Sequence, residues 1–287
     1  MRYNLAALAR RQRNIRKSAI VLREVSAPAM LATDLFQQVY RPTINLWTEA
    51  APTIIDEYAR TLASLTTDAP SDIQAQIDGA EAAFQRLFFA LTPSLRDWTL
   101  KVERSVRTKW RGAVLSATGV DLQTMIGPED VRDTLDAYLR WNVDLVADVS
   151  AQIKKRISDA VFSGLTQRKP AREVAKEISD AVGMGRDRAR RIAADQLSKL
   201  SNSLADERRR EAGIEVWAWI HSGKLHPRAQ HVARDGVYYS DVAANVGNSV
   251  GGRTVNAPPE RGDRPGQPPY CGCRSRSVLV FEFDEKR

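Results

Sequence analysis

The sequence predicts an α+β protein, with a long, mostly α-helical N-terminal region followed by a small β-rich C-terminal domain. Through residue 213 or so, apolar residues recur at steps of three and four, the period of an amphipathic helix. Beyond Gly213, aromatic and β-branched residues alternate with polar ones, which is typical of strands. We place the boundary between residues 159 and 160, so that residues 160–287 hold two helices, a small antiparallel sheet and a long Gly/Pro loop.

Residues 1–159 are predicted to form a region of several helices. Pro42 and Pro52 are expected to break helices or to lie in their first turns. The triplet Thr92-Pro93-Ser94 is expected to separate two further amphipathic helices. A fourth helix is predicted to begin near Pro128, which is followed by two acidic residues, and to run to Gly164.

Two more helices lead into the strands. The first is expected to end at Gly183 and Gly185, and the second to be closed by Gly213. Residues 214–223 and 235–241 are then predicted to form strands, and residues 245–270 a long loop rich in Gly, Pro, Asn and Arg. The alternating segment from Cys273 onward predicts a closing strand paired with the strand around Trp217 and Trp219, whose rings should pack in a core.

The formal net charge of +8 and the sequence pI of about 9.6 indicate an anionic partner, either nucleic acid or an acidic protein face. The same charge also fits solvated helix faces. No apolar run is long enough to predict a membrane span, and the N-terminus lacks the pattern of a signal peptide, so we expect synthesis in the cytoplasm and no membrane partner. The basic residues form three clusters: Arg10, Arg11, Arg13, Arg16, Lys17 and Arg23; Arg186, Arg188, Arg190 and Arg191; and Arg208, Arg209 and Arg210.

The side chains suited to a metal gather in the last quarter of the chain. His226, His231, Cys271 and Cys273 form a two-His, two-Cys set of the type that binds zinc. The two cysteines lie two positions apart, which puts both on one face of an extended strand. One intervening residue is nevertheless an unusual spacing for structural zinc. The alternative is a core in which small cysteines pack around a hydrogen-bonded His231.

A catalytic site is the other alternative for this region. A hydrolase, nuclease or transferase would be centred on Arg228, His231 and Asp235. No nucleophile signature surrounds either cysteine and no paired-carboxylate motif is present, so we predict no catalytic residue and no enzyme. The triplet Arg-Gly-Asp at 261–263 is too short to carry any inference.

Several short motifs occur together in a fixed order. They are Arg188–Arg191, Glu211–Gly213, Trp217 or Trp219, Arg228-x-x-His231, Asp235-Gly236, Tyr238 or Tyr239, Pro265-Gly266, and Cys271-Gly272-Cys273-Arg274. In this order they resemble the phage Mu protein F-like family of minor head proteins, over about residues 160–281. The chain departs from the family pattern at Lys224, at His226 and at residues 194–196.

The resemblance implies a minor, capsid-associated protein of a tailed bacteriophage that acts structurally in head morphogenesis. Such proteins are linked to the portal and to DNA retention or delivery. The implied partners are the portal protein or the major capsid protein, together with packaged double-stranded DNA held by non-specific electrostatics. The implied location is the virion, after synthesis in the bacterial cytoplasm. A DNA-binding protein of the host cell is the remaining alternative.

Overall fold

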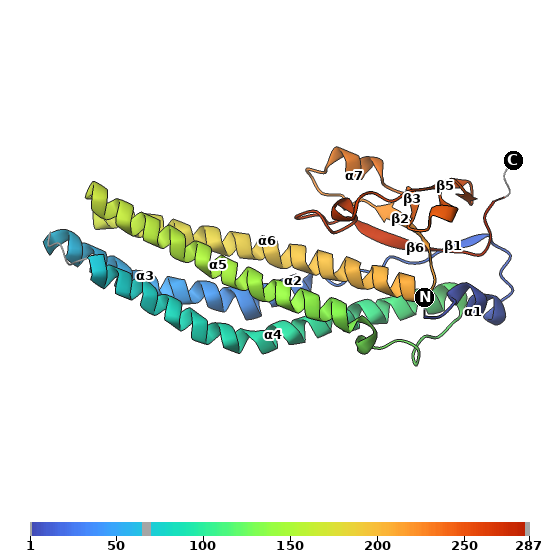
Figure 1. Cartoon of the computed structure of the whole chain (residues 1–287), viewed down its shortest axis with the longest axis horizontal. Helices are drawn as coiled ribbons and strands as arrows, with labels where there is room; N and C mark the ends of the chain where they lie inside the picture. Colours follow the sequence, from blue (N-terminus) through green and yellow to red (C-terminus); the bar gives the residue numbers. More distant parts are fainter. Residues whose placement is uncertain (1, 65–69, 285–287) are drawn as a thin grey trace. The chain divides into compact units, whose positions relative to one another are not determined.

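The computed structural model describes residues 2–64 and 70–284, and its elements are labelled in Figure 1. The predicted α+β class is confirmed. The helices are α1 (Leu5–Gln12), α2 (Met30–Leu35), α3 (Arg41–Ser64), α4 (Pro70–Thr118), α5 (Arg132–Gln167), α6 (Ala171–Glu211) and α7 (Ala229–Ala233), with a π-helical turn η1 (Phe36–Tyr40) and 3-10 turns η2 (Pro128–Val131), η3 (Ala243–Asn245) and η4 (Arg261–Asp263). The strands are β1 (Ala19–Val21), β2 (Val216–Ile220), β3 (Tyr238–Ser240), β4 (Ser249–Val250), β5 (Arg253–Asn256) and β6 (Arg274–Val280).

The chain divides into two compact units. Unit 1 combines Met1–Leu31, Leu100–Asp136 and Ala194–Arg287, and unit 2 combines Ala32–Thr99 and Ala137–Ala193. This division differs from the predicted boundary between residues 159 and 160, because α4, α5 and α6 are each long enough to contribute residues to both units. In the residues that the structure describes, no helix is long and apolar enough to cross a membrane.

Unit 1 is built on a six-stranded sheet with the order β1-β6-β2-β3-β5-β4 (Figure 1). The predicted pairing of the closing strand is confirmed, because β6 runs antiparallel to β2 with Trp217 opposite Ser277. The sheet was expected to be antiparallel throughout, but β3 and β5 pair in parallel. The segment 245–270, expected to be a long loop, contains both β4 and β5, since Gly251 and Gly252 at positive φ let the chain reverse between them.

The N-terminal segment is part of this sheet rather than of a helical region. Strand β1 pairs antiparallel with β6, and the backbone N–H of Phe281 donates to the carbonyl of Ser18. The backbone N–H groups of Arg2 and Tyr3 both donate to the carbonyl of Glu211 at the end of α6. The pairing satisfies the edge of β6, whose N–H and C=O groups would otherwise lack partners.

Three helix breaks predicted from sequence, at Pro52, at Pro93 and at Gly183 with Gly185, are wrong. Helix α4 continues through Pro93, because the burial of Leu91, Leu95 and Trp98 on either side offsets the lost hydrogen bond, which costs about 3 kcal/mol. Helix α6 continues through Gly183 and Gly185. A Cβ added at Gly185 would lie 2.6 Å from Ile153, so glycine allows α5 and α6 to approach closely there.

The start of α3 and the end of α6 agree with the predictions from sequence. Helix α3 begins at Arg41, which puts Pro42 in its first turn, yet it continues through Pro52. Helix α6 ends at Glu211, and Gly213 follows with a φ of +68°. The N–H of Ile214 then donates to the carbonyl of Arg209, which closes the helix with a glycine cap as predicted.

A buried guanidinium connects the three chain segments of unit 1. Arg208 near the end of α6 is 1% exposed. It donates to the carboxylate of Glu103 on α4 at 3.0 Å, to Asp130 of η2 at 3.3 Å and to Glu211 at 2.9 Å. Asp130 also pairs with Arg2, so the N-terminal segment joins the same network.

The burial of Arg208 predicts a large effect of its removal. Arg208→Ala should lower the free energy of unfolding by about 3–5 kcal/mol, because it removes the buried cation between three carboxylates and leaves Glu103 with only Arg107 and Asp130 with only Arg2. Arg210→Ala, an exposed position two residues further along the helix, should change it by less than about 0.5 kcal/mol. Urea unfolding followed by circular dichroism compares the two, and equal losses would contradict the role assigned to Arg208.

Candidate metal centre

His231 is placed by the short helix α7. The carbonyl of Arg228 accepts from the N–H of His231 and starts this turn. The imidazole is 2% exposed and meets the ring of Trp219 on β2 edge-on, with the centroids 5.0 Å apart. The neighbouring Trp217 and Tyr239 stack at 4.8 Å and complete an aromatic wall, as predicted for these tryptophans.

The loop that carries both cysteines is held by one face of α6. Asp195 accepts from the N–H of Tyr270 at 2.6 Å. Ser198 donates to the carbonyl of Cys271 at 2.9 Å, and Asn202 donates to that of Cys273 at 3.2 Å. Positions 195, 198 and 202 follow the i, i+3, i+7 spacing of a single helix face, so one helix fixes three backbone groups of the loop.

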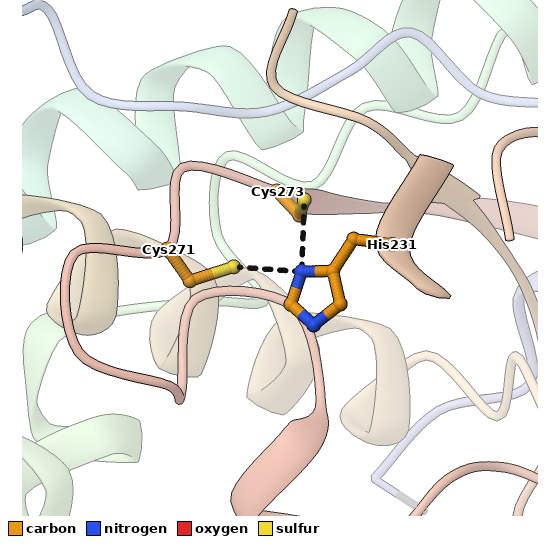
Figure 2. A group of neighbouring side chains, drawn as sticks. All are labelled: His231, Cys271 and Cys273. Carbon is orange, nitrogen blue, oxygen red and sulfur yellow. Dashed lines mark hydrogen bonds between the residues drawn. The ribbon is translucent and has the colours of Figure 1, made fainter. Parts of the chain in front are cut away.

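The structure brings His231, Cys271 and Cys273 together. The sulfur atoms of both cysteines lie 3.6 Å from Nδ1 of His231, as Figure 2 shows. The three potential ligand atoms all lie within 4.8 Å of one another, and all three residues are buried. Neither cysteine is in a disulfide.

The other imidazole nitrogen has a carboxylate partner. Nε2 of His231 lies 3.0 Å from Oδ1 of Asp263, and the second oxygen of Asp263 accepts from Arg234. Burial opposes the ionisation of Asp263, but the hydrogen bonds from His231 and Arg234 outweigh it and lower the pKa of the carboxyl. The ionised carboxylate therefore fixes the orientation of the ring and keeps the proton on Nε2.

The two thiols influence each other. The hydrogen bond from Cys273 lowers the pKa of Cys271 to about 5, against the effect of burial. The same contact raises the pKa of Cys273. The backbone N–H groups of Cys273 and Gly266 also lower the pKa of Cys271, and that of Ser222 acts in the same direction on Cys273. These N–H groups stabilise negative charge on sulfur.

His226, the fourth residue of the predicted metal set, is not in this group. It is exposed and lines the wall of a pocket of about 330 Å³, into which His231 and both cysteines also face. Lys224 and Arg228 line the same pocket and donate to the carbonyls of Tyr270 and Pro269, respectively.

The other motif residues have structural partners. Asp235 accepts from the N–H of His221 at 2.9 Å, and within residues 2–64 and 70–284 no hydrogen bond or ion pair joins its side chain to His231. Gly236, with a φ of +75°, donates to the carbonyl of Trp219. Arg274 pairs with Glu24 at 2.6 Å. The centre proposed for an enzyme, Arg228 with His231 and Asp235, is therefore not assembled in the described chain.

Sequence reasoning missed the residues that support the centre. Asp263 lies in the Arg-Gly-Asp triplet that was given no weight, 32 residues along the chain from His231. Asp195 and Asn202 lie on α6, for which the sequence analysis considered only the apolar residues and not the polar face. The spacing of Asp195, Ser198 and Asn202 on one face was the available signal.

The comparisons with known proteins address this same region. The family model described as phage Mu protein F like protein matches residues 151–276. This part of the chain is therefore similar to the phage Mu protein F-like family. The resemblance predicted from the ordered motifs is thereby confirmed, and the match supports a role in phage head morphogenesis and a location in the virion.

One curated relative matches more than half of the chain. It is an uncharacterized protein of Haemophilus influenzae (strain ATCC 51907 / DSM 11121 / KW20 / Rd), 27% identical over 163 residues. The alignment covers 56% of this chain and 33% of the relative, so the chain spans about a third of that protein's length. No solved structure matches the chain.

The Pro265-Gly266 motif of the Mu F-like segment has a steric role that can be tested. Gly266 has a φ of +77°, and a Cβ there would lie 2.5 Å from the side-chain nitrogen of Asn202. Gly266→Ala should therefore destabilise unit 1 by at least about 1–2 kcal/mol, and should break the bond from Asn202 to the cysteine loop.

Gly262→Ala is the matched control in the same loop, because a Cβ there meets nothing within 4 Å. We expect its free energy of unfolding to stay within about 0.5 kcal/mol of the wild type. Chemical denaturation measures both variants. Similar stability of the two would contradict the steric role of Gly266.

Proposed function

We propose that the protein is a minor, capsid-associated head protein of a tailed bacteriophage, with a structural role at or near the portal. The observation that carries this proposal is the match of residues 151–276 to the Mu F-like family. The proposed protein partners are the portal protein, the major capsid protein or both. A position near the portal also suggests a part in retaining or delivering packaged DNA.

Contact with packaged DNA is supported by a basic groove near the N-terminus. Arg13, Arg16, Lys17 and Arg23 are exposed and line a groove of about 560 Å³ together with the end of α4. No carboxylate within residues 2–64 and 70–284 forms an ion pair with any of these four side chains. Cations without acidic partners are suited to phosphate contacts, which are electrostatic and independent of base sequence.

The other two basic clusters contribute less to such a surface. Arg208 and Arg209 are buried, so the expectation that they lie on a solvated or DNA-facing surface is wrong. Arg188 pairs with Asp148, and Arg190 lies near Asp187 and over the ring of Phe36. We therefore assign DNA contact to the basic groove.

Reversing the charge of the basic groove should weaken DNA binding. With Arg13, Arg16, Lys17 and Arg23 all replaced by Glu, the slope of log K against log salt should become shallower by about 3–4, because each lost phosphate contact contributes about 0.9. Fluorescence anisotropy with duplex DNA over a salt series measures the slope. An unchanged slope would exclude this groove as the DNA contact.

A matched control carries the same change of charge at exposed basic positions of unit 2. The substituted residues, all to Glu, are Arg86, Arg96, Arg172 and Lys176. We expect this variant to keep most of the salt dependence of the wild type. If both variants lose it equally, DNA binding depends on net charge alone.

The head assignment is tested on particles from the phage that encodes the chain. We expect mass spectrometry to find the protein in purified procapsids and heads, at a small fraction of the major capsid protein. Cross-linking of intact heads should join it to the portal or the capsid protein. Separated tails are the control fraction. Recovery only from the particle-free lysate or from tails would refute the proposed function.

A further inference from the structure

We propose that His231, Cys271 and Cys273 bind one zinc ion, with the fourth coordination position facing the adjacent pocket. This inference does not depend on the proposed head function. The two can fail separately, because metal content is measured on the purified protein and head assembly on particles.

The spacing of the three ligand atoms fits a tetrahedral ion. Zinc lies about 2.3 Å from a thiolate sulfur and about 2.0–2.1 Å from an imidazole nitrogen, so tetrahedral angles separate nitrogen and sulfur by about 3.6 Å. Nδ1 of His231 lies 3.6 Å from the sulfur of Cys271 and 3.6 Å from that of Cys273. Both separations therefore agree with a common ion between the three atoms.

Hydrogen bonding without a metal explains the group less well. With the proton of the imidazole on Nε2, beside Asp263, Nδ1 presents a single lone pair toward the two sulfurs (Figure 2). One lone pair accepts well from only one S–H group, yet the two sulfurs are equally distant. A cation placed between them interacts with the nitrogen and both sulfurs at once.

The surroundings fit thiolate ligands. Both cysteines are buried beside His231 and neither is in a disulfide, so both sulfurs are available to a metal. Asp263 on the far nitrogen of His231 forms the carboxylate–histidine arrangement found behind metal-bound imidazoles. Two thiolates and an imidazole in tetrahedral geometry favour zinc over calcium, magnesium and manganese, which prefer oxygen ligands.

Zinc binding at this site can be written with protons and charges balanced. Each cysteine coordinates zinc as a thiolate, any thiol proton it still carries passes to water, and His231 coordinates through the lone pair of Nδ1 as a neutral ring. The two thiolates then neutralise the charge of the ion. No oxidation or reduction occurs.

The fourth coordination position of the zinc is not filled by His226, the residue expected there from sequence. His226 is exposed and outside the ligand group, whereas the pocket of about 330 Å³ reaches both cysteines and His231. We therefore assign the fourth position to a water molecule from the pocket. Three protein ligands and an accessible position give a more exchangeable ion than a closed four-ligand site.

The first experiment measures the metal content of the full chain purified without chelators from zinc-supplemented cells. We expect about one zinc ion per chain by plasma mass spectrometry. Replacing zinc with cobalt should give the near-ultraviolet bands of thiolate-to-cobalt charge transfer and the visible bands of four-coordinate cobalt. A wild-type protein with no zinc, no cobalt uptake and two reactive thiols would overturn the proposal, as would a Cys271–Cys273 disulfide.

Paired variants assign the ligands. His231→Ala should lose the zinc, and His226→Ala should retain it. Retention by His231→Ala, or loss by His226→Ala, would refute the three-ligand set. If His231→Ala does not fold, the cobalt spectra of the wild type still test the metal site. They report thiolate ligation and coordination number without any substitution.

A second pair tests the support behind His231. Asp263→Asn keeps the shape of the side chain but removes its charge, and should lower zinc affinity about 10–100-fold in a chelator competition. Asp235→Asn is the matched control, since that exposed carboxylate binds only the turn at His221. Equal affinities of the two variants would contradict a metal-bound His231.

Discussion

A single buried guanidinium holds unit 1 together. Arg208 meets carboxylates from α4, η2 and the end of α6, and the η2 carboxylate also binds Arg2. A buried charge of this kind is tolerated only when it is fully paired, so three distant stretches of chain must be correctly placed at the same time. The sheet, the cysteine loop and the N-terminal groove all belong to the unit that this network closes.

Helix α6 serves both this network and the candidate metal centre. One part of it contributes Arg208, and an earlier part contributes Asp195, Ser198 and Asn202 to the cysteine loop. In the cysteine loop, backbone groups of residues 270, 271 and 273 bond to side chains of α6. These side chains take the place of the neighbouring strand to which such groups bond in a sheet. The positions of the two sulfurs therefore depend on α6, and the ion pairs of Arg208 near the end of that helix fix its position.

Much of this arrangement was predictable from local chemistry. Alternation identified β2 and β6, a glycine identified the end of α6, and residue type identified His231 and both cysteines. Strand β1 has three residues in a basic segment, too few for a periodic signal. Arg208 and Arg210 cannot be distinguished by sequence, because burial of one and exposure of the other depend on helices distant in the chain. Asp263 was missed for the same reason: its partner is 32 residues away and on another element.

The pairing of β1 with β6 has a consequence for synthesis on the ribosome. Arg10, on helix α1, donates to the carbonyl of Phe281, which lies 271 residues later. At about 5–20 residues per second, the two partners emerge tens of seconds apart. Until then the early segment has no strand to pair with, although its basic side chains are already exposed. The sheet of unit 1 is thus completed only after β6 has emerged from the ribosome, and chaperone binding to nascent chains of increasing length would reveal that interval.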